Sequence, residues 1–378
     1  MDISTLVVHG SKQKLDSTGS VSVPIYQSAT FAHPGVGEST GFDYSRDRNP
    51  TRSHLEETMA AIEGGVDAIA FSTGMAAISA LMELFSPGEH IVASSDLYGG
   101  TRRLFEKISV KNGMSVSYAD SSDLSALEKA LTPNTKAIFI ETPSNPMMLV
   151  TDIAACAKLA GGRGILLIVD NTFLTPYYQQ PLALGADIVM HSGTKYLGGH
   201  NDTLAGFLVA KDGQLAAKLR EIYKTTGGCL SPFDSWLIIR GIKTLGVRMD
   251  RQSATALTLA EWLSKQKKVS KVFYPGLPTH PGYQLSARQA SGFGAMISVK
   301  VESEQVARDT LERVRLIQYA ESLGGVESLI TYPMLQTHAD VPAEWRETLG
   351  VDGRLLRISV GIESPADLMA DLAQALGV

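Results

Sequence analysis

The sequence of 378 residues predicts an α/β protein with a mostly parallel sheet, and three observations support this fold class. Apolar runs of strand length alternate with helical patterns over most of the first 210 residues. These runs are continuous in Val, Ile, Leu and Ala, which is typical of strands covered by helices on both faces. Several runs end in small or polar residues, and parallel sheets bind ligands at the carboxyl ends of their strands.

Composition limits the classes of partner. The net charge of −5 disfavours a nucleic acid or an anionic membrane surface. No apolar run reaches membrane-spanning length and the first residues lack the pattern of a signal peptide, so we expect a cytoplasmic protein. The two cysteines, Cys156 and Cys229, are too few for a disulfide framework, and we expect Cys156 to pack within a helix. We expect no metal site.

Residues 1–48 are expected to form an N-terminal arm, because they are rich in Gly, Ser, Thr and Pro and lack a regular periodicity. A segment of this length without helices or strands usually lies on its own domain or on a neighbouring subunit. Beyond Tyr44, three arginines follow closely: Arg46, Arg48 and Arg52. Guanidinium groups match phosphate and carboxylate, so this cluster fits either an anion site or a solvated loop.

A helix is expected from His54, followed by a strand over Asp67–Phe71. The small turn Ser72–Met75 then leads directly into the helical stretch AAISALMELF. Such a strand–turn–helix unit points backbone N–H groups and the positive end of a helix dipole at a phosphate. The turn matches neither a P-loop nor a dinucleotide fingerprint, so its signal alone is weak.

The alternation continues along the chain to residue 209. Further strands are expected at 90–93, 115–118, 136–140, 164–169, 187–190 and 204–209, with helices at 101–111, 123–131 and 152–160. Because parallel strands share one carboxyl edge, the loops at that edge are expected to bring five residues together: Gly74, Tyr98, Asn145, Asp170 and Lys195.

Two of these residues suggest a specific chemistry. One apolar run ends at Asp170, and another ends in the turn Ser192–Thr194, which presents Lys195. A lysine at a sheet edge can form an imine with an aldehyde, and an acid beside it can hold a protonated ring nitrogen. Taken alone, the same turn also fits an ordinary surface lysine.

The C-terminal part alternates less regularly and predicts a smaller α+β domain. A long helical region over 233–267 precedes strands at 269–274, 295–299 and 355–360 and helices at 304–313 and 365–376. We therefore divide the chain into the arm, a large domain over 49–240 and a C-terminal domain over 241–378. Arg357 lies in the apolar stretch LLRISV, where an unpaired guanidinium is costly, so a carboxylate of the protein or of a ligand must accompany it.

Eight segments together resemble the Cys/Met-metabolism family of pyridoxal-phosphate enzymes, the trans-sulfuration group within fold type I. They occur in the order and with the spacing of that family and span nearly the whole chain: YSRDRNPT, FSTGMAAI, DLYGGT, ETPSNP, VDNTF, HSGTKYLGGHND, ESLGGVES and LLRISVGIE. The resemblance implies a fold type I architecture with an arm, a large cofactor-binding domain and a smaller C-terminal domain. It also implies pyridoxal 5′-phosphate as the cofactor.

The resemblance assigns expected roles at the cofactor. Lys195 is similar to the lysine that links to the cofactor, Asp170 to its partner at the pyridine nitrogen, and Tyr98 to a residue that stacks on the ring and can act as an acid or base. The phosphate-binding set implied by the resemblance includes two residues from a neighbouring subunit, Tyr44 and Arg46, besides Gly74, Met75, Ser192 and Thr194. The smallest active unit would then be a dimer, and two dimers would form a homotetramer.

The resemblance also implies how an amino-acid substrate binds. Arg357, Asn145 and Ser322 would contact its α-carboxylate end. Glu321 and Arg103 would face the distal end, where they could attract an amino group and a carboxylate. The alternatives are loop solvation for Glu321 and helix-surface ion pairing for Arg103.

The stretches GFDYSR, GGHND, SPFDSW, RGIKTL and TYPMLQTHAD are most similar to cystathionine γ-synthases of Gram-positive bacteria, some of which are also O-acetylhomoserine thiol-lyases. We therefore expect γ-replacement on an O-acylhomoserine with cysteine; the alternative is elimination, as in a cystathionine β-lyase or γ-lyase or another C–S lyase. Gly100 replaces a cysteine of methionine γ-lyases, and Arg48 replaces a common glycine near the expected substrate entrance. A binding module without turnover fits less well, because the resemblance implies a complete catalytic set. A dinucleotide oxidoreductase fits less well still, since no GxGxxG opens a helix after the first strand.

Overall fold

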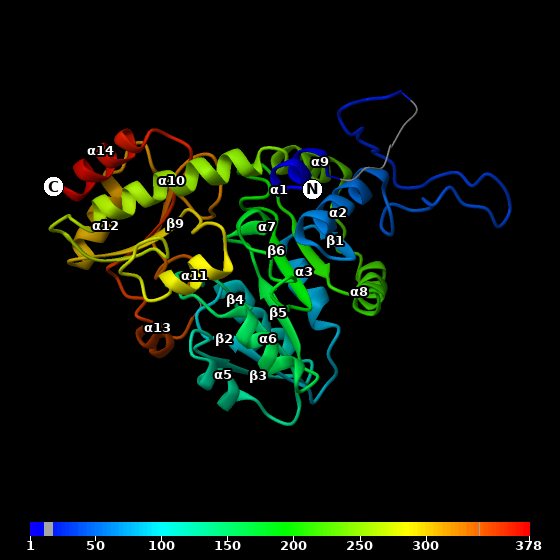
Figure 1. The fold of residues 1–378 in the computed structure, drawn as a ribbon, viewed down its shortest axis with the longest axis horizontal. Helices are drawn as coiled ribbons and strands as arrows, with labels where there is room; N and C mark the ends of the chain where they lie inside the picture. The colour runs from blue at the N-terminus through cyan, green and yellow to red at the C-terminus, as the bar shows by residue number, and fades with distance from the viewer. Residues whose placement is uncertain (11–17, 340) are drawn as a thin grey trace.

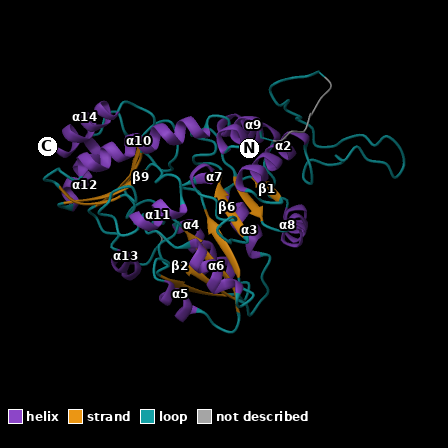
Figure 2. Cartoon of the chain, in the orientation of Figure 1, coloured by secondary structure: helices purple, strands orange, loops and turns teal. Residues whose placement is uncertain are grey.

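The computed structural model describes residues 1–10, 18–339 and 341–378, which form two sheets flanked by helices (Figures 1 and 2). The larger sheet has seven strands. In spatial order they are β1 (Asp67–Phe71), β7 (Gly206–Ala210), β6 (Ile188–Ser192), β5 (Leu166–Asp170), β4 (Thr135–Glu141), β2 (His90–Ser94) and β3 (Ser115–Ala119). Only β7 runs antiparallel to its neighbours, so the expected mostly parallel sheet is confirmed.

The central strands are buried along nearly their whole length, as their continuous apolar sequences predict. Helices on both sides provide this cover: α2 (Pro50–Glu63), α3 (Gly74–Met82), α4 (Gly99–Leu104), α5 (Leu124–Ala130), α6 (Ile153–Gly161), α7 (Thr175–Tyr178) and α8 (Gly213–Thr226). Helix α2 begins at Pro50, earlier than the expected His54, because the Asn49 side chain accepts from the Thr51 and Arg52 amides and proline suits the first helical position.

Two helices differ from the sequence-based prediction. The helix expected at 101–111 begins at Gly99 as α4 and continues as a π-helix over Phe105–Ser109. Helix α8 was not expected, although Ala216, Leu219 and Tyr223 recur on one buried face with helical spacing. The periodic signal for α8 was therefore present in the sequence.

The smaller sheet has five strands in the order β10 (Gln318–Tyr319), β11 (Leu329–Thr331), β12 (Leu355–Ser359), β9 (Met296–Val301) and β8 (Val269–Phe273). The expected long helical region is divided into α9 (Pro232–Ile242) and α10 (Leu245–Leu263). The remaining helices are α11 (Tyr283–Gln289), α12 (Glu304–Arg313), α13 (Ala343–Leu349) and α14 (Pro365–Leu376). The short strands β10 and β11 were not expected, and the division at residue 240 stays a prediction.

We had expected an N-terminal arm without helices or strands, and this expectation is wrong for its first residues. Helix α1 (Ile3–His9) is capped by the Asp2 side chain and buries Val7. After residues 11–17, which lie outside the described residues, the chain leaves the body of the molecule as a long extended segment before α2 (Figure 1). Val21 and Val36 on this segment are almost fully exposed. Apolar side chains in such a position suit contact with another surface.

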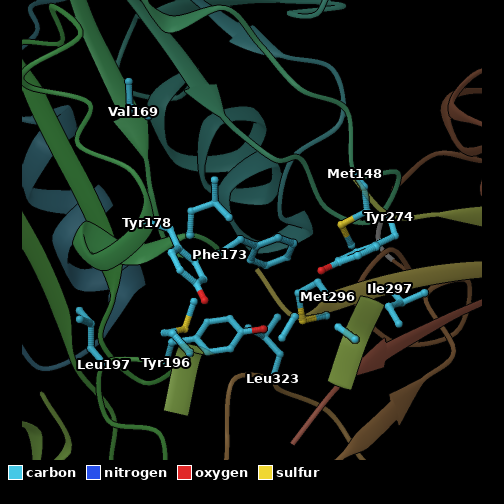
Figure 3. Packing of buried hydrophobic residues seen from close by; sticks show 14 of the residues in the cluster. Met148, Val169, Phe173, Tyr178, Tyr196, Leu197, Tyr274, Met296, Ile297 and Leu323 are labelled. Atoms are coloured by element: carbon cyan, nitrogen blue, oxygen red, sulfur yellow. The ribbon is translucent and has the colours of Figure 1, made fainter. Parts of the chain in front are cut away.

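One hydrophobic cluster extends across the two sheets, and a second cluster covers the other face of the large sheet. Figure 3 shows Phe173 and Tyr178, which follow β5, beside Met296 of β9 and Leu323 of the loop before β11. The expected packing role of Cys156 is confirmed, since this residue of α6 is buried in the same core. Among the helices that the structure describes, none combines the length and apolar character needed to cross a membrane.

Candidate active site

A cavity of about 420 Å³ lies at the carboxyl edge of the large sheet. This volume is in the range of small-molecule sites. The five residues expected to converge there all line it: Gly74, Tyr98, Asn145, Asp170 and Lys195. Seven further expected site residues also line it: Met75, Arg103, Ser192, Thr194, Glu321, Ser322 and Arg357.

Lys195 lies in the turn after β6, and its ammonium group points toward the small sheet. Its Nζ donates to Ser322 Oγ at 2.9 Å. Burial, and after it the Arg357 charge, lowers the pKa of Lys195 to about 8, while the Glu321 charge opposes the shift. A fraction of this amine is therefore neutral near physiological pH, which a nucleophile or base requires.

Asp170 ends β5 and is buried beneath the cavity. Its Oδ1 accepts from the Thr172 amide at 3.0 Å and from the Thr172 hydroxyl at 2.5 Å. No donor of the described residues bonds its second oxygen, Oδ2, so that oxygen is available to a bound group. Burial raises the pKa of Asp170, while the two Thr172 bonds oppose this rise.

The start of α3 forms the candidate phosphate cradle. Thr73 caps this helix through the Ala76 amide, and the first amides of α3 have no partners within the helix. A Cβ on Gly74 would approach Ser192 Cβ and Met190 Cε to 3.2 Å, so a side chain here would fill the cradle. The Thr194 hydroxyl also bonds the Ala205 backbone, which holds the Lys195 turn against β7.

Tyr98 stands at the start of α4 with its ring partly exposed in the cavity. Its amide donates to Glu141 Oε2 at 2.9 Å. A Cβ on Gly100 would come within 2.4 Å of the Tyr98 ring, and a Cβ on Gly99 within 2.2 Å of the Thr337 carbonyl oxygen. Both glycines are therefore required for this packing of the ring and the Thr337 loop.

Arg357 of β12 projects from the small sheet into the cavity. Its guanidinium donates to Asn145 Oδ1 at 2.8 Å, and to the Ser322 carbonyl and Thr331 Oγ1 at 3.2 Å each. Among the described residues, no carboxylate forms an ion pair with Arg357. Its buried Nε also has no hydrogen-bond partner among them. Of the two sequence-based alternatives, the structure therefore favours a ligand carboxylate. Burial lowers the pKa of Arg357 to about 10.

Ser322 joins the two sides of the cavity. Its φ of +89° lies in the left-handed region, which is uncommon for a residue with a side chain. In this conformation its hydroxyl meets Lys195 while its carbonyl meets Arg357. Such backbone strain is often found at functional sites.

Arg103 and Glu321 are exposed and lie at the rim of the cavity. They provide opposite charges at one opening. The structure does not place Tyr44, Arg46 or Arg48 among the lining residues. Arg46 donates to the Lys224 carbonyl, and Arg48 lies over the Phe42 ring, outside the cavity of its own chain.

Sequence reasoning missed Glu141, Thr172 and Thr337 in the cavity. Glu141 could have been predicted from the sequence, because it directly follows the expected end of β4 at Ile140. Residues at the carboxyl ends of parallel strands face the ligand site. Thr172 follows Asp170 by two residues, as a short hydrogen-bonding side chain often does in a turn. Thr337 lies in an irregular loop; the stretch TYPMLQTHAD was part of the family resemblance, but its residues were given no role in the site.

These residues fit pyridoxal phosphate. The cradle at Gly74 suits the phosphate, the free Oδ2 of Asp170 suits a ring N–H, and the partly neutral Lys195 suits the aldehyde. Arg357 remains available for a second, carboxylate-bearing ligand.

Comparison with known proteins agrees with this geometry. The sequence model of the Cys/Met metabolism PLP-dependent enzymes matches residues 4–377. A cystathionine β-lyase of Lactococcus lactis is 48% identical, over 99% of this chain and 98% of its own length. A cystathionine γ-synthase/O-acetylhomoserine (thiol)-lyase of Bacillus subtilis is 51% identical, over 95% and 92%.

A solved structure shows the same similarity in three dimensions. The cystathionine γ-lyase of Lactobacillus plantarum, complexed with L-serine, superimposes with a TM-score of 0.96 at 42% identity, covering 100% of this chain and 99% of that one. The match over nearly all residues includes both sheets. The chain therefore belongs to the pyridoxal-phosphate-dependent enzymes of cysteine and methionine metabolism.

Proposed function

We propose that the enzyme is a cystathionine γ-synthase, which replaces the γ-substituent of an O-acylhomoserine with cysteine. The pair of opposite rim charges, Arg103 and Glu321, beyond the buried Arg357 fits the two amino-acid substrates of this reaction. Arg357 suits the α-carboxylate of the donor. The rim charges suit the carboxylate and ammonium of cysteine. The observation that carries the choice of replacement is the similarity to the Bacillus subtilis synthase, at 51% identity.

The second candidate is elimination from cystathionine to a keto acid, ammonia and a thiol. The same rim charges suit the distal amino-acid end of cystathionine. The similarity to the Lactococcus lactis β-lyase supports this alternative. The two candidates share every residue of the cavity and differ in the reaction that follows the loss of the α-proton.

In both candidates the residues act in the same order. Arg357 and Asn145 hold the substrate α-carboxylate, and this contact directs the Cα–H bond toward Lys195. Neutral Lys195 takes the Cα proton at Nζ, and Ser322 Oγ holds that nitrogen in place. Bound pyridoxal phosphate supplies an electron-accepting ring that stabilises negative charge at Cα. Tyr98, which lines the cavity, would stack on the bound cofactor and exclude water, or would take part as a further acid or base.

We also propose that two chains complete each cavity and that two such dimers form a homotetramer in the cytoplasm. Tyr44 and Arg46 lie outside their own chain's cavity on an extended, exposed segment that could reach another chain. Mixing Lys195→Ala with Arg46→Ala subunits tests this arrangement. Activity should return in the mixture, because a hybrid dimer contains one intact cavity. No return of activity would contradict shared sites.

A product assay separates the two activities. We expect O-acetylhomoserine or O-succinylhomoserine with cysteine to give cystathionine faster than cystathionine alone gives keto acid and ammonia. Faster keto acid release from cystathionine would replace the leading proposal with the elimination reaction. Cystathionine and keto acid should be measured in the same reaction mixture, because one substrate can enter both routes.

A further inference from the structure

Glu141 and Asp170 form a pair of adjacent buried carboxyl groups. They end the neighbouring parallel strands β4 and β5 and lie opposite each other in the sheet register. Strands in such a pair are about 4.8 Å apart. Only 5% of Glu141 and 7% of Asp170 is exposed, and both side chains line the cavity. Two buried carboxyl groups therefore face the same cavity.

The two carboxyl groups have unequal hydrogen-bond support. Asp170 accepts two bonds from Thr172, one of them a short bond from a hydroxyl. Glu141 accepts one bond, from the Tyr98 amide at 2.9 Å. Hydrogen bonds to a carboxylate stabilise its ionised form, so Asp170 is the member of the pair that carries the negative charge more readily. Within the described residues, Glu141 takes part in no ion pair.

The charged groups around Glu141 favour the same distribution. Asp96, which follows β2, and Asp170 both raise the pKa of Glu141, while Arg357 of β12 lowers it. Burial is the largest cause, and the net result is a pKa well above the ordinary value of 4.5. Burial also raises the pKa of Asp170, but the two Thr172 hydrogen bonds and the His191 charge on β6 oppose that rise. Adjacent buried carboxyl groups titrate as a pair, and one of them retains a proton.

We propose that Glu141 is a positioning residue that keeps a proton next to the Asp170 carboxylate and fixes the backbone of Tyr98. The neutral carboxyl accepts from the Tyr98 amide, and Asp170 remains the single negative charge of the pair. That charge is then available to a ring N–H. The proposal applies to replacement and to elimination alike, and so it goes beyond the choice between these two reactions.

Substitutions at Glu141 test the proposal in the holoenzyme. Glu141→Leu leaves the Tyr98 amide unpaired, and we expect kcat/KM to fall about tenfold or more. Glu141→Gln is neutral and still accepts from Tyr98, so it should recover most of this loss. Asp170→Asn removes the charge and should lose at least about 10²-fold. The proposal is overturned if Glu141→Gln loses as much as Asp170→Asn, or if Asp170→Asn is the tolerated variant.

A second measurement uses the apoprotein and does not depend on turnover. A raised carboxyl pKa in the folded state stabilises the protein below the unfolded-state pKa, and this contribution is lost as the pH rises toward the folded-state value. Glu141→Gln has no such loss. Its unfolding midpoint should therefore rise relative to wild type as the pH increases from about 5 to 8.

Glu128→Gln is the matched control, because Glu128 is exposed and pairs with Arg163 on the surface. Its unfolding midpoint should follow the wild-type curve over the same pH range. A constant difference between Glu141→Gln and wild type would overturn the proposal, even if no substrate were turned over. If the variant kinetics and the unfolding result both hold while wild-type enzyme releases keto acid from cystathionine faster than it makes cystathionine, the proposed function fails and the proton-holding role of Glu141 stands.

Discussion

The two walls of the cavity are built differently. The large-sheet wall (Gly74, Asp170, Ser192, Thr194 and Lys195) follows strand ends directly, and its key groups have backbone or neighbouring side-chain partners. The small-sheet wall (Glu321, Ser322, Gln336 and Arg357) has one buried anchor, Arg357, and otherwise comes from loops. The first wall suits a fixed cofactor, and the second suits a substrate that varies. Relatives that are named for different activities, a β-lyase and a γ-synthase, fit this contrast.

The largest effect is expected on the large-sheet wall. Lys195→Ala removes the proposed base, so turnover should fall by roughly 10³-fold or more. The change should appear in kcat for every amino-acid substrate, measured by product release. Lys211→Ala is the control, since that lysine pairs with Asp187 on the surface at 4.0 Å. Substantial turnover by Lys195→Ala would move the base to another residue.

The next effect concerns the anchor of the small-sheet wall. Arg357→Lys keeps the charge but loses the fork that meets Asn145, Ser322 and Thr331, so kcat/KM should fall roughly 10²-fold. The absorption spectrum of the bound cofactor should stay unchanged, because the large-sheet wall is intact. Arg354→Lys, three residues earlier and exposed, should behave as wild type. A loss of cofactor would show that the walls are not separable in this way.

The same contrast explains what the sequence could predict. Asp170 and Lys195 were predicted from apolar runs that end at a shared sheet edge, and both lie there. The buried Arg357 was noticed because a charge interrupts an apolar strand. Gln336 and Thr337 were missed because they come from an irregular loop, whose position depends on packing far along the chain. The helix α1 was missed because it is short, and its cap at Asp2 was not considered.

A third, smaller effect is a pH dependence of cofactor uptake. The pKa of Lys195 is lowered to about 8, chiefly by burial and then by Arg357. The neutral amine reacts with the cofactor aldehyde, so the uptake rate of the apoprotein should rise about tenfold per pH unit below 8 and level off above it. Absorbance after mixing with pyridoxal phosphate measures this rate. An uptake rate that is already constant at pH 6 would mean that the large-sheet wall lowers this pKa further. An uptake rate that still rises past pH 10 would mean that the wall leaves the pKa of the amine unperturbed.

The smallest effect is expected at the rim, where Glu321 is exposed. Glu321→Gln removes the charge that would face a distal ammonium, and solvent screening limits the loss to about 1 kcal/mol, or roughly a fivefold rise in KM. The rise should affect cystathionine and cysteine but not O-acetylhomoserine, which has no distal ammonium. Glu327→Gln, which lies outside the cavity, is the control.

This variant also connects the two walls. The Glu321 charge raises the pKa of Lys195. Removing this charge should therefore shift the rising part of the curve of cofactor uptake rate against pH to slightly lower pH. A change in KM without this movement would mean that the rim acts on the substrate alone. Equal losses for cystathionine and O-acetylhomoserine would contradict a distal-ammonium contact. Glu321 would then support the loop around Ser322, and substrate choice would depend on other residues of the small-sheet wall.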